Sequence, residues 1–216
     1  MRCFNGELYL VRGLFMTIGI ALAGGNLSKK KELCSLLEQS HLKVVADSVV
    51  ESVSVAENGL TFIENALIKA RAACKKYYSS AIGDDSGLEV FALDGRPGIH
   101  TARYADKSEN NIEKLLDEMR SVPIQKRQAN FVCVLVFLKH EHDAAPLIAQ
   151  GFWQGEIAFA PQGDQGFGYD PIFWIPEYRC TAAKLSFEIK NQISHRAKAV
   201  NELINKIKER YGKSFN

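Results

Sequence analysis

Two adjacent aspartates, Asp84 and Asp85, follow an apolar run in the stretch at 81–90, AIGDDSGLEV, and Ser-Gly separates them from a second run. Neighbouring carboxylates repel each other, and placement at the edge of a core raises the cost of keeping them ionised. The Asp-Asp-Ser-Gly residues predict a turn between strands at 80–83 and 88–93. Because ionised carboxylates at such a place are costly, this turn is the first candidate for a functional site in the chain.

Lysines gather where the first predicted helix begins. The strand expected at 17–23 leads into Gly-Gly-Asn at 24–26, and the helix at 28–40 then carries lysines at 29–31. Cations near a helix N-terminus are unfavourable by about 0.3–1 kcal/mol each. A strand, a glycine loop and a helix start nevertheless form a good anion cradle. The alternative is a solvated basic face, and Ser28 stands where a Walker A loop needs glycine.

The last predicted helix, 194–211, repeats this conflict. Ser194 is a natural N-cap, yet His195 and Arg196 follow it into the positive end of the helix. A structural histidine is the simpler explanation for a single His. Two helix starts that carry cations together favour an anionic or oxo-bearing ligand.

A third group of polar residues lies on the long helix predicted at 61–80. Thr61, Asn65 and Lys69 are spaced by four, apart from the apolar stripe, and Glu57 lies just ahead. A solvent-exposed helix face is the alternative, and periodicity alone favours it. With the aspartate pair, however, the chain has the acids and lysines that a Mg-triphosphate site requires. The apolar stripe consists of Ile63, Ala66, Leu67, Ala70 and Cys74.

A glycine-rich loop is predicted at 162–174, QGDQGFGYDPIFW. Its glycines and proline limit regular structure, so we expect the loop to expose Phe167 and Tyr169, with Asp170 beside them. Such aromatic rings can stack on a nucleobase. Alternatively, they fold back onto the core.

The remaining segments alternate between helix and strand. This mixture predicts one α/β domain, although the strand order cannot be derived from it. Strands are expected at 42–47, 48–55 and 130–138, a strand pair or hairpin at 146–159, and a helix at 108–122.

The composition is that of an ordinary soluble globular protein, with 46% hydrophobic and 24% charged residues in 216. A net charge of +2 neither requires nor excludes nucleic acid, and no apolar stretch is long enough to span a membrane. The five cysteines are scattered, which argues against a zinc cluster, a redox pair or a disulfide framework. We expect them to be core residues in a reducing cytoplasm.

Residues 1–15 precede a second methionine, Met16, and are too short and interrupted in their apolar content for a signal peptide. We interpret 1–15 as a dispensable extension and 16–216 as a single domain. A chain that begins at Met16 is therefore expected to fold and keep full activity. A large fall in melting temperature or turnover would show that the extension packs on the core.

Five segments in order resemble the inosine/xanthosine triphosphate pyrophosphatase family, which removes deaminated purines from nucleotide pools. They are AGGNLSKKKEL, ENGLTFIENALIKA, DDSGLEVFALDGRPGIHTARYA, GFGYDPIF and ISHR, and together they span 23–196. The first motif of the family usually reads Ala-Thr-x-Asn-x-Gly-Lys, so Gly24 and Ser28 depart from it. Lys184 stands where an acid is common, and we interpret it as peripheral.

The resemblance implies an elongated α/β fold, with a mixed twisted sheet, flanking helices and two lobes around a central active-site cleft, usually as a homodimer. It implies Mg²⁺-dependent hydrolysis of ITP, dITP and XTP to the monophosphate and pyrophosphate. Asp85 would be the general base, with Glu57, Asp84 and Asp85 on the metal side. The implied substrate-binding residues are Gly24, Asn26, Lys29, Lys69, Ser86, Phe167, Gly168, Tyr169, Asp170, Lys190, His195 and Arg196.

Two other classes of protein remain as alternatives. A nucleotide sensor that does not hydrolyse would have no use for the aspartate pair as a base. A nucleic-acid-binding protein would need a broader basic patch than this balanced charge provides. We therefore expect a purine nucleotide substrate, and neither a nucleic-acid nor a membrane partner.

Overall fold

The computed structural model describes residues 19–39, 42, 44, 55–105 and 110–212. The extension at 1–15 and nearly all of the strand expected at 48–55 lie outside these residues. Of the strand expected at 42–47, Leu42 and Val44 are described, and Val44 forms a parallel bridge with Ile20.

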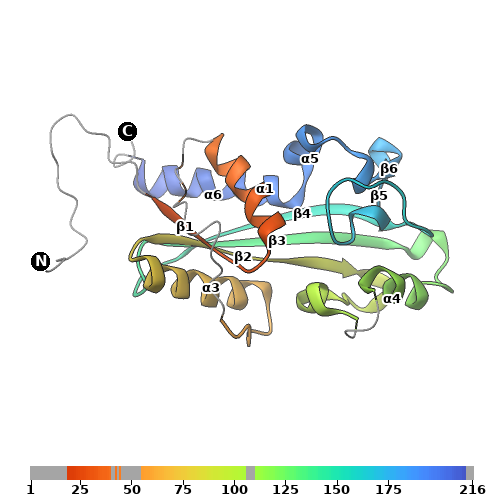
Figure 1. Ribbon diagram of the computed structural model, residues 1–216, viewed down its shortest axis with the longest axis horizontal. Helices are drawn as coiled ribbons and strands as arrows, with labels where there is room; N and C mark the ends of the chain where they lie inside the picture. The colour runs from red at the N-terminus through yellow and green to blue at the C-terminus, as the bar shows by residue number, and fades with distance from the viewer. Residues whose placement is uncertain (1–18, 40–41, 43, 45–54, 106–109, 213–216) are drawn as a thin grey trace, which may run out of the picture.

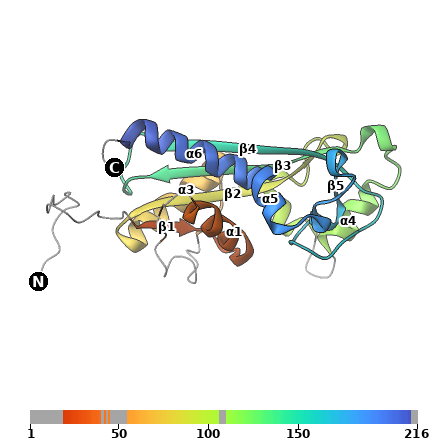
Figure 2. The same cartoon turned by 90° about the horizontal axis from the view of Figure 1, so that it is seen from above.

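A six-stranded mixed sheet forms the centre of the molecule, and its strands follow one another in chain order. The first two strands are parallel and every later neighbour is antiparallel. Its three long central strands run along the long axis, so the molecule is elongated (Figures 1 and 2). The strands are β1 (Ile20–Ala23), β2 (Ser80–Val90), β3 (Gln128–Leu138), β4 (Leu147–Ile157), β5 (Phe173–Ile175) and β6 (Cys180–Thr181).

Two predictions about strands are wrong. The aspartates do not form a turn: β2 continues through them, and Asp84 and Asp85 pair with Leu135 and Val134 of β3. The segment at 146–159 is not a strand pair but the single long strand β4. In both cases polar or glycine residues lie inside a strand, because neighbouring strands satisfy its backbone and other elements accommodate its side chains.

Helices cover both faces of the sheet. In Figure 1, α3 (Phe62–Tyr77) lies below it, while α1 (Leu27–Glu38) and α6 (His195–Tyr211) lie above it. At the other end of the sheet lie α4 (Asn111–Glu118) and α5 (Phe187–Ile193). The predicted helices at α1, α3, α4 and α6 are confirmed, with α4 shorter than expected, whereas α5 was not predicted.

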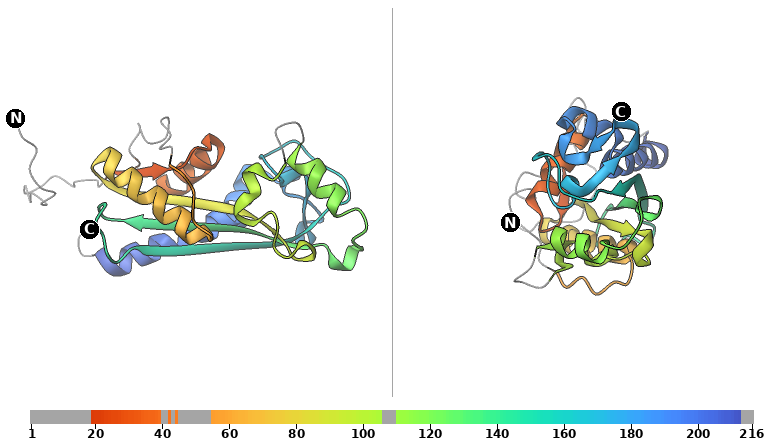
Figure 3. Two further views of the ribbon diagram at one scale, coloured as in Figure 1. Left: turned by 90° about the horizontal axis from the view of Figure 1, so that it is seen from below. Right: turned by 90° about the vertical axis from the view of Figure 1, so that its right-hand side faces the viewer.

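Side-chain alternation along β3 divides the core between the two faces. Val132, Val134 and Val136 pack against α3, whereas Cys133 and Leu135 pack against α1 and α6. A third apolar cluster fills the far end of the sheet. The end view in Figure 3 shows helices on both sides of the sheet. The expected elongated α/β fold with a lobe at each end is therefore observed.

Two smaller expectations concern cysteines and membranes. The four cysteines of the described residues are free, and Cys74 and Cys133 are buried in the core as expected, while Cys34 and Cys180 are half-buried. Among the described residues, no helix combines the length and apolar content needed to cross a bilayer.

Candidate active site

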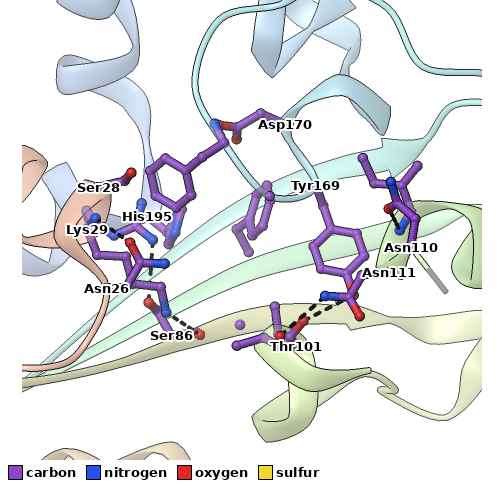
Figure 4. Close-up of a pocket in the computed structure, with 17 residues that line it drawn as sticks. Asn26, Ser28, Lys29, Ser86, Thr101, Asn110, Asn111, Tyr169, Asp170 and His195 are labelled. Carbon is purple, nitrogen blue, oxygen red and sulfur yellow. Dashed lines mark hydrogen bonds between the residues drawn. The ribbon is translucent and has the colours of Figure 1, made fainter. Parts of the chain in front are cut away.

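A pocket of about 400 Å³ opens between the two ends of the sheet. In Figure 4, Asn26, Lys29 and His195 lie at one end of it, and Tyr169 and Asn111 lie at the other. Nine of the expected residues line this pocket: Asn26, Lys29, Ser86, Phe167, Gly168, Tyr169, Asp170, His195 and Arg196. The other expected residues, Gly24, Glu57, Lys69, Asp84, Asp85 and Lys190, are not among the residues that line it.

The two aspartates point to opposite faces of the sheet, because successive side chains of a strand alternate. Asp85 faces α3, where its Oδ1 lies 2.6 Å from Lys69 Nζ. Asp84 faces α1 and α6, and its Oδ1 accepts a hydrogen bond from Cys133 Sγ at 3.4 Å. The repulsion expected from their adjacency is therefore reduced by the strand itself.

Lys69 is the centre of an ion cluster on the α3 face. Its Nζ contacts Asp85 Oδ1, the backbone oxygen of Asp84 at 3.0 Å and Glu57 Oε2 at 3.2 Å. Lys69 is only 7% exposed, so this helix face is buried and not solvated. Burial opposes its charge, but the surrounding carboxylates raise the pKa of Lys69 overall. Burial also raises the pKa of Asp85, although Lys69 opposes that shift.

Asn65 connects this cluster to the loop before α3. Its Nδ2 donates to Asp85 Oδ2 at 3.4 Å, and its Oδ1 accepts from Gly59 N at 2.9 Å. Thr61, one helical turn earlier, forms a capping box with Glu64 that fixes the start of α3. The polar face predicted on this helix thus orients both Asp85 and the loop of Glu57.

The chemistry of these acids fits a hard cation. Glu57 and Asp85 approach the same ammonium group, and the Glu57 side chain is 31% exposed, so water can reach it. Carboxylates with access to water are the ligands that Mg²⁺ prefers. The Asp84 side chain lies on the other face of β2, and no group of three His, Cys, Asp or Glu residues within the described chain is arranged to hold a metal. The structure therefore brings two of the three expected acids together.

The start of α1 provides one cation to the pocket. Lys29 Nζ donates to the backbone oxygen of Ser86 at 3.0 Å, and the Asn26 side chain caps the helix through Lys29 N. Burial lowers the pKa of Lys29, with Arg196 acting in the same direction, while Asp84 opposes the shift. Lys31 is exposed, so the solvated alternative holds for that residue. Gly24 adopts a φ of 150°, which glycine tolerates and a threonine rarely does.

A second, buried ion cluster lies beside the pocket, on the α1 and α6 face of the sheet. Glu32 accepts from Lys190 Nζ at 3.0 Å and from Arg196 Nη1 at 2.6 Å. Lys190 also contacts Asp170 Oδ2 at 2.6 Å, and that oxygen accepts from Phe167 N at 2.8 Å. Alternating charges thus connect α1, α5, α6 and the glycine-rich loop.

Phe167 lies against the cations of this cluster. Lys190 Nζ and the guanidinium carbon of Arg196 are each 5.1 Å from its ring centroid, within the range of cation–π contacts. The ring is half-buried and lines the pocket. Phe167 is therefore positioned to offer a face to a planar ligand.

His195 lies flat on the aromatic floor of the pocket. Its ring is 4.8 Å from that of Phe131, at an interplanar angle of 12°. Burial, reinforced by Arg196, Lys190 and Lys29, lowers the pKa of His195 well below its usual value, so the imidazole is neutral at pH 7. Within the described structure, the buried Nδ1 of His195 and Nε of Arg196 have no hydrogen-bond partner. A buried polar atom without a protein partner calls for an explanation such as an ordered water or a ligand, and both residues line the pocket.

Tyr169 corrects one expectation about the loop. It is 3% exposed, and its hydroxyl donates to the backbone oxygen of Thr101 at 3.2 Å. The ring therefore belongs to the core at the far end of the sheet and holds the loop closed. Lys184 bonds Gln162 Oε1 at an exposed position, in agreement with a peripheral role.

Sequence analysis missed Glu32 and the far wall of the pocket. Glu32 is a buried acid beside Leu33, Leu36 and Leu37 of α1, and the available signal was an acid next to that apolar stripe. Thr101, Asn110 and Asn111 line the far wall, but each makes a local turn or cap bond that gives no indication of a site.

Known proteins resemble this chain over most of its length. Residues 20–206 match the model of the Ham1 family. This chain belongs to the Ham1 family. A relative named dITP/XTP pyrophosphatase from Photobacterium profundum is 49% identical over 193 residues, which cover 88% of this chain and 98% of the relative. A protein of the same name from Escherichia coli K12 is 47% identical over 192 residues, with the same coverage.

Solved structures of the Ham1 family have the same fold. The HAM1 protein from Coxiella burnetii superposes with a TM-score of 0.79 at 42% identity, covering 89% of this chain and 99% of that one. The Ham1 protein from Staphylococcus aureus superposes with a TM-score of 0.75 at 39% identity and the same coverage. The family match at 20–206 covers β1 and all but the end of α6, and so covers both ion clusters.

Proposed function

We propose that this Ham1-family chain hydrolyses the deaminated purine nucleotides ITP, dITP and XTP to the monophosphate and pyrophosphate. The observation that carries the proposal is the pair of unpartnered buried atoms, His195 Nδ1 and Arg196 Nε, beside Phe167 in a pocket that Lys29 also lines. Such a pocket offers polar groups and an aromatic face to a base and a cation to phosphates. The names of the curated relatives support the same activity.

In the proposed reaction, Asp85 removes a proton from the water that attacks the α-phosphorus. Its raised pKa makes it a better proton acceptor than an ordinary carboxylate. Lys69 and Asn65 hold the carboxylate in place, and Lys29 and Lys69 would bind the phosphate oxygens. Mg²⁺ held by Glu57 and Asp85 would offset the negative charge of the triphosphate.

Base selection rests on hydrogen-bond polarity. Inosine and xanthosine carry an oxo acceptor at position 6, whereas adenosine carries an amino donor there. Arg196 has only donors, and neutral His195 has one donor and one acceptor nitrogen. A site built for an acceptor rejects a donor because buried groups are left unpaired, and the preference can reach about 10⁴.

The experiment is a nucleotide panel with Mg²⁺ that measures pyrophosphate and orthophosphate separately. We expect ITP, dITP and XTP to release pyrophosphate with kcat/KM values far above those of ATP, and chelation of the metal to stop the reaction. Comparable turnover of ATP, or release of orthophosphate as the first product, would contradict the proposal. A homodimer, implied by the family resemblance, and a cytoplasmic location, expected from the scattered cysteines, remain predictions, and the dimer can be checked by light scattering.

Phe167→Ala is expected to weaken substrate binding by about 1–3 kcal/mol, the scale of base–aromatic stacking. The ring lines the pocket beside Arg196, so its loss should raise KM for several nucleotides together and leave kcat less affected. Steady-state kinetics on ITP and XTP check this. An unchanged KM would assign Phe167 to packing of the loop alone.

A further inference from the structure

The first turn of α6 lies directly on the backbone of β4 at Gly151. A Cβ at this position would lie 1.9 Å from the backbone oxygen of His195 and 2.6 Å from Ala199 N. Both obstacles are backbone atoms, so no side-chain rotation can relieve the contact. Any residue larger than glycine must therefore push the start of α6 away from the sheet.

The aromatic floor under His195 belongs to the same sheet face as Gly151. Trp153 follows Gly151 by two residues and pairs in register with Phe131. The His195 ring is nearly parallel to both, at 12° to Phe131 and 18° to Trp153. Trp153 does not line the pocket, and it reaches the ligand site through His195 and through Phe131, which lines the pocket. Gly151 thus supports the backbone of His195, and the two rings support its imidazole.

Side chains of α6 also fix its position along β4. Lys198 Nζ donates to Phe152 O at 2.9 Å, Glu202 Oε2 accepts from Gln150 N at 2.8 Å, and Lys206 Nζ donates to Ile148 O at 2.6 Å. Four helical residues rise about 6 Å, and two strand residues rise about 6.6 Å. The two repeats match, so α6 and β4, which run side by side in Figure 2, are held in register. The separation of α6 from the sheet is then set at Gly151.

We propose that Gly151 is a positioning residue for base selection, an inference that rests on the proposed function. Its missing side chain sets the height of α6 above β4 and hence the place of His195 and Arg196 in the pocket. Gly83 has the corresponding position on the other face, because a Cβ there would lie 2.0 Å from Ala66 O and 2.7 Å from Ala70 N of α3. That contact sets the height of α3 above the sheet and hence the position of Lys69, which is proposed to bind the phosphates.

The two glycines provide matched variants. Misplacing a catalytic or binding group by 1 Å can cost about 10²-fold in rate. Gly151→Ala is expected to lower the ratio of kcat/KM for ITP to that for ATP by at least about tenfold, because the base contacts move. Gly83→Ala is expected to slow both nucleotides and leave the ratio within about twofold of wild type, because Lys69 acts on phosphates common to both.

The ratio is a decisive readout because it does not depend on how much of the enzyme is folded. If Gly151→Ala is not recovered as folded protein, Trp153→Leu tests the same support from its other side, and its ratio should also fall. A wild-type ratio in the recovered variant, or an equal fall of the ratio in Gly83→Ala, would overturn the inference. The proposed function would still stand in that case, provided that the unmutated enzyme prefers ITP to ATP. Wild-type enzyme without selectivity for ITP would overturn the proposed function itself, and this inference with it.

Discussion

Asp85→Asn is expected to lower turnover of ITP by about 10²–10⁴, the usual range for loss of a positioned base. The amide keeps the size of the carboxylate and can still accept a hydrogen bond from Lys69, but it cannot take a proton from water. Substrate binding should survive or strengthen, because one negative charge near the triphosphate is removed. Steady-state and single-turnover kinetics on the variant measure both quantities.

Asp84→Asn is the matched control for this prediction. It removes a neighbouring carboxylate from the same strand, but on the face of Cys133 and not of Lys69. We expect a smaller loss of turnover than for Asp85→Asn, with more of the effect in KM. Burial opposes the charge of Asp84, but Lys29 and Arg196 lower its pKa overall, so Asp84 interacts mainly with two cations that line the pocket. Near-normal turnover of Asp85→Asn, or equal losses in both variants, would remove Asp85 from the role of base.

Arg196→Ala is expected to collapse the selectivity for ITP over ATP, which can be as large as about 10⁴ in a site that selects by hydrogen bonds. Activity on ITP should fall, whereas the rate on ATP, which the proposed selectivity makes low, should change little. The variant also leaves Glu32 with Lys190 as its remaining ion-pair partner among the described residues, so a loss of stability of a few kcal/mol is expected. Melting temperature and kcat/KM on both nucleotides separate the two effects.

The control for Arg196→Ala is Lys208→Ala, which removes an exposed cation from the same helix away from the pocket. It should leave both selectivity and melting temperature near wild type. Equal slowing of ITP and ATP by Arg196→Ala would show that Arg196 binds the phosphates or supports the fold instead of contacting the base.

Helices and strands with a regular spacing of apolar residues were predictable from the sequence, whereas most of the contacts between them were not. The helix α3 and the strand β3 follow from the spacing of their apolar residues. The course of β2 through Asp84 and Asp85 could not be predicted from the sequence, because a central strand can carry polar side chains that pair with ions from other elements. Lys29 and His195 stand out in the sequence as cations at helix starts, and the family resemblance assigned them to substrate binding.

Glu32 shows why the rest of the site was missed. Its partners Lys190 and Arg196 lie 158 and 164 residues away in the sequence. No local pattern reports a contact over that separation, and an acid in a lysine-rich helix suggests only surface charge. The burial of Tyr169 was missed for a related reason, since its hydroxyl meets Thr101 from a distant segment.

Hydrolysis of ITP in water labelled with heavy oxygen tests the central claim most directly, because the label marks the phosphorus that water attacks. With Asp85 directing water to the α-phosphorus, mass spectrometry should find the label in inosine monophosphate and unlabelled pyrophosphate. Label in the pyrophosphate, or a diphosphate with labelled orthophosphate, would contradict the account.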